Sequence, residues 1–160
     1  MKRRIPCVWS RQWLSIVAEC DIRPTRHGRL YAKLLIFKNP RTLQVFWRDG
    51  LKNGSLGRWT VGAVNALVHW TETVGATGEV IRKQRDVDPR YFCVIGLCET
   101  KLSMEVISHE AVHAGFCYAK RVKRTPWDAA RKFDEEEVAY PSGAIAKKIN
   151  AFLYARKLYR

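Results

Sequence analysis

Two histidines and a glutamate stand together in the segment His109-Glu110-Ala111-Val112-His113. Residues four apart on an α-helix lie on one face, so both imidazoles can reach a single zinc ion at about 2.0–2.1 Å. Glu110 projects toward the same cleft and is placed to accept a proton from a water molecule that zinc activates. The pattern H-E-x-x-H therefore predicts His109 and His113 as zinc ligands and Glu110 as the general base.

A catalytic zinc site needs a third protein ligand and an open position. Ala119 stands where the longer pattern H-E-x-x-H-x-x-G-x-x-H requires another histidine, which excludes that pattern. His27 and His69 lie upstream, where a third ligand is unusual. The dense set of candidates is Asp134-Glu135-Glu136-Glu137. Since a helix turns about 100° per residue, only one of its three glutamates can point squarely at the metal.

The histidine motif followed by Glu136-Glu137-Val138-Ala139 resembles the zincin metallopeptidases of the gluzincin type. Those proteins carry H-E-x-x-H and then E-x-x-A or E-x-x-x-D on a later helix. The fragments SHEAVHA and DEEEVAYPSG also resemble small metallopeptidase-like proteins encoded by phages and prophages. The similarity covers about residues Tyr91–Phe152, and only the motif residues are specific.

The resemblance implies a zinc-dependent hydrolase, acting as a peptidase on a peptide or protein substrate. Glu136 would be the third ligand, ahead of Glu135 and Glu137, because Glu136 and the small Ala139 match E-x-x-A. Tyr140 replaces the family's aspartate, which leaves open what orients the imidazoles. Tyr140 is either a hydrogen-bond donor to the oxyanion of the reaction or a packed residue.

The substrate-binding strand is a further expectation from this resemblance. In zincins the strand before the motif helix commonly forms the sheet edge that binds an extended substrate. In this chain that strand would be near Tyr91–Cys98, and a peptide would add to it as a further strand.

The charge balance supports a second hypothesis. Lysine and arginine number 29 against 15 aspartates and glutamates, a formal net charge of +14. The alternative function is a phage-type basic binding protein on a zincin scaffold that blocks a host factor or binds nucleic acid. A scattered, solvated basic face explains the same charge without a partner. A third reading is a fortuitous motif in a structural protein.

Composition limits the class of protein. Hydrophobic residues make up 47% of the 160 residues, which excludes global disorder. The longest uncharged runs, such as Trp59–Thr71, are too short and polar to span a bilayer, and Arg11 interrupts any signal-peptide core. The five cysteines include no C-x-x-C pair, so we expect free thiols in a reducing cytoplasm, that of the bacterial host if the protein is phage-encoded.

The elements that must position the motif form one α+β domain over residues 1–160. We expect a small antiparallel sheet with a short N-terminal helix in residues 1–98, and metal-binding helices in residues 99–160. The predicted strands are Leu30–Phe37, Thr42–Trp47, Ala66–Thr71 and Tyr91–Cys98. The predicted helices are Ile5–Cys20, Leu102–Val122 and Asp134–Leu158, the last kinked or split at Pro141, with Ser142 as a possible cap. Gly75–Asp88 reads as a loop.

Overall fold

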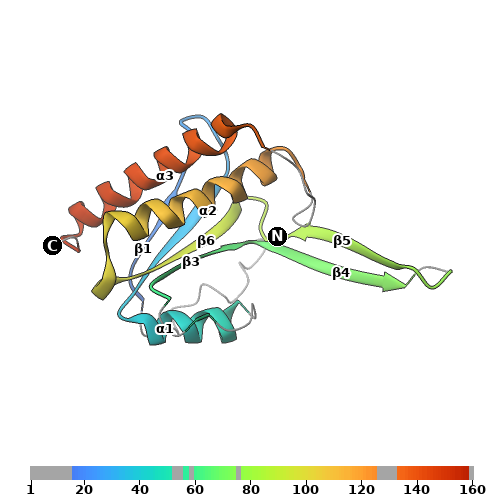
Figure 1. Ribbon diagram of the computed structural model, residues 1–160, viewed down its shortest axis with the longest axis horizontal. Helices are drawn as coiled ribbons and strands as arrows, with labels where there is room; N and C mark the ends of the chain where they lie inside the picture. Colours follow the sequence, from blue (N-terminus) through green and yellow to red (C-terminus); the bar gives the residue numbers. More distant parts are fainter. Residues whose placement is uncertain (1–15, 52–55, 58–59, 75–76, 126–132, 159–160) are drawn as a thin grey trace, which may run out of the picture.

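A four-stranded sheet lies between two helical layers, with α2 and α3 on one face and α1 on the other (Figure 1). The computed structural model describes residues 16–51, 56–57, 60–74, 77–125 and 133–158. The strands are β1 (Ile16–Ile22), β2 (Tyr31–Phe37), β3 (Gly62–Ala66), β4 (Val68–Val74), β5 (Val80–Asp86) and β6 (Tyr91–Cys98). The helices are α1 (Pro40–Val45), α2 (Met104–Val122) and α3 (Glu135–Ala155), with a π-helical segment at Phe46–Gly50 and a 3-10 turn at Glu99–Lys101. The expected α+β class is confirmed.

The sheet has the strand order β1-β2-β6-β3. It is mixed and not antiparallel, because β2 and β6 run parallel while the other two pairs are antiparallel. All residues of β6 are buried, as expected for an interior strand covered on both faces. The expectation that Tyr91–Cys98 forms the sheet edge is therefore wrong. Within the described part of the chain, β3 is the edge strand on that side.

Alternate residues of the central strands feed two cores, because successive side chains of a strand point to opposite faces. One core joins the sheet to the two long helices through Leu34, Ile36, Ile95, Leu97, Ile107, Ala111, Ile145 and Ile149. The other joins the sheet to α1 and the π-helical segment through Leu35, Phe37, Val94, Leu43, Phe46 and Trp47. The motif helix is thus fixed against the sheet by its own apolar face.

The segment after β2 is helical, so the predicted strand Thr42–Trp47 is wrong. Asn39 caps the helix: its side chain accepts a hydrogen bond from the backbone N–H of Thr42 at 3.1 Å. The Thr42 hydroxyl accepts one from the backbone N–H of Asn39 at 3.4 Å. Pro40 occupies the first turn, where its missing N–H costs nothing. These local capping signals outweigh the β-branched and aromatic content that suggested a strand.

Two more segments differ from expectation. Residues 16–20 belong to β1, so the predicted helix Ile5–Cys20 is wrong there, and the rest of it lies outside the described residues. The predicted loop Gly75–Asp88 contains β5, which pairs with β4 in a separate two-stranded sheet. Figure 1 shows this hairpin extending away from the main sheet.

The two long helices run antiparallel and pack closely (Figure 1). Ser103 caps α2 through a hydrogen bond from the Val106 N–H at 3.2 Å. A Cβ on Gly115 would lie 2.9 Å from the carbonyl oxygen of Val138, so glycine permits this close approach. Pro141 lies inside α3 and does not split it. Ser142 does not cap a second piece: its hydroxyl donates to the Val138 carbonyl at 2.6 Å.

Candidate metal centre

The two motif histidines converge on one point. Their Nε2 atoms lie 3.1 Å apart and their ring centroids 4.7 Å apart. Two nitrogen ligands at about 2.0–2.1 Å from a tetrahedral zinc ion are roughly 3.3 Å apart. His109 and His113 therefore fit two of the ligand positions of a zinc ion.

The pattern of α2 explains why these rings face outward. Ala111 and Ala114 are buried against the sheet, which turns the two histidines to the exposed side of the helix. Partial burial, and then the neighbouring His109, lower the pKa of His113. A lowered pKa favours the neutral imidazole, and this is the form that binds a metal.

Glu110 lies on a different side of α2 and is buried, with 6% of its surface exposed. Burial raises the pKa of its carboxyl from 4.5 to about 7. Its neighbour is Gly62 in β3: a Cβ placed there would lie 2.8 Å from both Cγ and Oε1 of Glu110. The glutamate is thus held between the motif helix and the edge strand, in a place that only a glycine leaves open.

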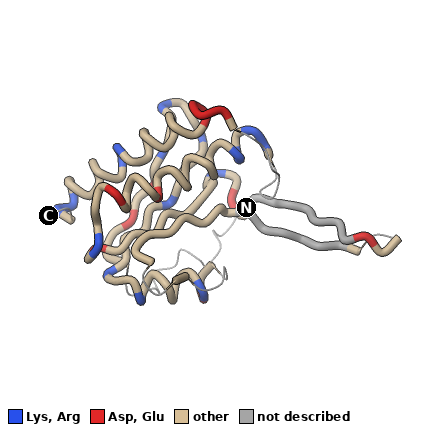
Figure 2. The backbone as a smooth tube through the Cα atoms, in the orientation of Figure 1, with Lys and Arg blue, Asp and Glu red and all other residues tan. Residues whose placement is uncertain are grey.

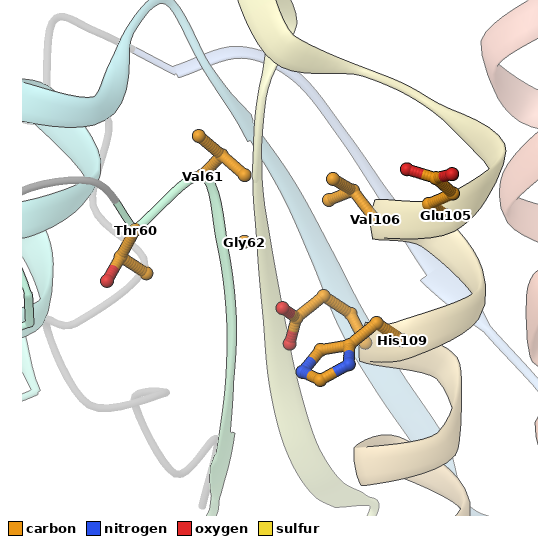
Figure 3. A pocket seen from close by; sticks show the side chains of 7 residues that line it. Thr60, Val61, Gly62, Glu105, Val106 and His109 are labelled. Carbon is orange, nitrogen blue, oxygen red and sulfur yellow. The ribbon is translucent and has the colours of Figure 1, made fainter.

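A cleft of about 380 Å³ lies between the start of β3 and the first half of α2. It is lined by Thr60, Val61, Gly62, Glu105, Val106, His109 and Glu110. Figure 3 shows His109 facing the strand that carries Gly62 across this cleft. One predicted ligand, His109, and the predicted base therefore open into the same space.

The predicted third ligand is not brought to the histidines in this structure. In the described residues, no group of three or more His, Cys, Asp or Glu side chains lies close enough to hold a metal. Glu135 and Glu136 are exposed at the start of α3. Glu137 bonds instead to Lys123 at 2.6 Å and accepts from the Asp134 N–H at 3.2 Å. The residues present fit two zinc ligands, and Glu136 as the third stays a prediction.

Tyr140 is 72% exposed, so the alternative that it is a packed residue is wrong. Its role as a hydrogen-bond donor to an oxyanion stays a prediction. His27 is exposed in the connection between β1 and β2. His69 lies in β4, outside the sheet that supports the motif helix.

Sequence reasoning missed Gly62 and its neighbours Thr60 and Val61. Val61 and Gly62 begin a segment, Val61–Val74, whose pattern fits both a helix and a strand, and a strand is expected only at Ala66–Thr71. Nothing in the local sequence indicates that Gly62 meets Glu110, since the contact joins residues far apart in the chain. The described cysteines Cys20, Cys93, Cys98 and Cys117 are free thiols, as expected.

Comparison with protein families, with curated proteins and with solved structures finds no match to this chain. No helix in the described part is long and apolar enough to cross a membrane.

Proposed function

We propose that this chain is a zinc-dependent hydrolase that cleaves peptide bonds. The observation that carries the proposal is the geometry of α2. Two imidazole nitrogens lie 3.1 Å apart, and one of these histidines shares a cleft with a buried glutamate. This geometry supports two zinc ligands and one general base supplied by a single sequence motif.

Glu110 supplies the proton transfers of the proposed reaction. Zinc, when bound, polarises a substrate carbonyl and lowers the pKa of water toward about 7. The raised pKa of Glu110, about 7, suits a carboxylate that accepts a proton from water and then gives it to the leaving amide nitrogen. Gly62 contributes by leaving the space that this carboxylate occupies.

The edge strand β3 provides the place for an extended substrate. Its partner β6 covers one side, and no further described strand pairs with the other. An extended peptide can therefore add to β3 through backbone hydrogen bonds, next to the cleft that holds Glu110. This assigns the substrate strand to β3 in place of β6.

The test combines metal content with hydrolysis. Protein purified with zinc is analysed for metal and assayed against a mixed peptide library, beside Glu110→Gln and His109→Ala. The proposal requires zinc in the parent and in Glu110→Gln, its loss in His109→Ala, and hydrolysis only in the parent. A parent that binds no zinc and cleaves no peptide contradicts it.

A binding function is the second candidate, and the β4–β5 hairpin favours it. An isolated two-stranded hairpin is marginally stable alone, and this one pairs only within itself in the described sheets. Figure 2 shows lysine and arginine on several elements, with acidic residues gathered at the start of α3. Salt-sensitive binding of duplex DNA by zinc-free protein would support a nucleic-acid partner.

A further inference from the structure

The cleft beside Glu110 has an unusual charge for this chain. The described residues that line it include two carboxylates, Glu105 and Glu110, and neither lysine nor arginine. The chain as a whole carries a net charge of +14. The net charge of the protein repels a cationic group at long range, whereas the two carboxylates of this cleft favour it.

The cleft also has apolar walls near Glu105. Figure 3 shows Val61, Val106 and Glu105 at one end and His109 at the other. The two valines are half-buried and Glu105 is exposed. Glu105 forms no ion pair within the described part of the chain. Its carboxylate is thus available to a ligand.

The dimensions suit a long basic side chain. Residues 105 and 109 lie four apart on α2, a rise of about 6 Å. A lysine side chain spans roughly the same length, with a four-carbon stem and a charged head. Such a stem packs on valine side chains while its head reaches a carboxylate. Apolar walls that end in a carboxylate thus match lysine or arginine better than leucine.

We infer that the cleft selects peptides with a lysine or arginine next to the bond to be cleaved, and that Glu105 is the specificity-determining residue. The inference rests on the proposed hydrolase, since it takes the reacting bond to lie between His109 and Glu110. Glu105 touches the substrate side chain and takes no part in the proton transfers.

The experiment measures peptide binding in the full-length Glu110→Gln protein, so that no peptide is consumed. The probes are fluorophore-labelled acetyl-Ala-Gly-X-Gly-Ala-amide peptides in which X is lysine, norleucine or glutamate. Norleucine keeps the stem of lysine and lacks its charge. We expect the lysine peptide to bind about tenfold more tightly than the norleucine peptide, as for one charge-assisted hydrogen bond.

The lysine-peptide affinity divided by the norleucine-peptide affinity is the selectivity ratio. Adding Glu105→Gln to the Glu110→Gln protein should reduce this ratio to about one. Adding Glu105→Lys to that protein should shift the preference to the glutamate peptide. Glu19→Gln is the matched control, because it removes an exposed carboxylate from β1, at the opposite edge of the sheet. That variant should keep the ratio. Thermal melting checks that α2 remains folded, since Glu105 also lies in its first turn.

Equal binding of the lysine and norleucine peptides overturns the inference, as does a ratio that survives Glu105→Gln. These results are separable from failure of the hydrolase. If the parent lacks zinc and activity but the Glu105-dependent ratio remains, the proposed subsite stands and the proposed function fails. If the parent hydrolyses peptides but the ratio is absent, the proposed function stands and the proposed subsite fails.

Discussion

The two sides of the histidine pair are built differently. On the β3 side, Glu110 is buried and fits against Gly62, in contact with a strand that pairs with the centre of the sheet. On the α3 side, Glu135 and Glu136 are exposed, and Glu137 is engaged by Lys123 and by its own helix cap. The proposed base is therefore fixed by packing, while two of the three carboxylates considered as third ligand are exposed to solvent.

This difference teaches which part of the site depends on the fold. Burial orders a side chain by removing its alternative rotamers, as it does for Glu110. An exposed glutamate keeps those rotamers and is ordered only by a partner. A third ligand from α3 would become ordered when a metal binds, whereas the proposed base is in place beforehand.

The largest expected effect is the loss of zinc binding when either histidine of the pair is replaced, because the β3 side and the α3 side of the site share this pair. His109→Ala and His113→Ala should each abolish zinc binding, because one imidazole with no second nitrogen is a weak site. Metal analysis of purified protein measures this. His27→Ala is the control, since His27 is exposed between β1 and β2 and should leave zinc unchanged. Full zinc in either motif variant would show that the metal binds elsewhere.

The second prediction concerns the β3 side. Glu110→Gln keeps the shape of the side chain but removes its basicity, so zinc should remain while hydrolysis falls by about 10²–10⁴-fold. Zinc content and peptide cleavage are measured on the same preparation. Loss of zinc in this variant would make Glu110 a ligand and reverse the assigned roles.

The third prediction concerns the α3 side. Glu136→Gln should weaken zinc binding by about 10–100-fold if the metal orders Glu136, because a neutral amide is a poorer ligand. Glu135→Gln and Glu137→Gln should leave zinc affinity largely unchanged. Competition with a coloured chelator gives the three affinities. An unchanged affinity in Glu136→Gln would remove Glu136 as the third ligand.

The fourth prediction uses the pH dependence of zinc-free protein. The pKa of Glu110 is raised from 4.5 to about 7, so its stabilising contribution is complete below pH 4.5 and is lost as pH rises through 7. Glu110→Gln has no such loss. Above pH 7 the free energy of unfolding of Glu110→Gln should therefore be higher than that of the parent, by at most about 3 kcal/mol. At pH 4.5 the two proteins should have nearly equal free energies of unfolding. Urea unfolding at both pH values measures the difference, and a variant less stable than the parent at pH 8 would contradict the buried placement.

The smallest expected effect tests the contact between Gly62 and Glu110. Gly62→Ala inserts a Cβ 2.8 Å from the Glu110 side chain and should destabilise the protein by about 1–3 kcal/mol. Gly143→Ala is the control, because a Cβ there meets nothing within 4 Å and α3 should gain about 0.5–1 kcal/mol. Thermal melting compares the two. Equal stability of Gly62→Ala and the parent would mean that Glu110 does not rest against β3.

Much of the helical side of the site is predictable from the sequence. The spacing of His109 and His113 places both rings on one helix face, and the helix is found at Met104–Val122. The buried strand Tyr91–Cys98 and the strand Tyr31–Phe37 are also confirmed. Each of these features depends on residues close together in the chain, through helical periodicity or a continuous apolar run.

What the sequence by itself determined is therefore the motif, its helix and the α+β class. The tertiary structure alone decided that β3 and not β6 is the edge strand, that Gly62 leaves room for Glu110, and that Glu105 shares the cleft. Strand order and cross-element contacts join residues distant in sequence, and no local pattern encodes them. The carboxylates at the start of α3 are a further example of contacts that the sequence does not determine. Their spacing from the histidines in the sequence matches the motif, but it does not fix how far the second helix lies from the first.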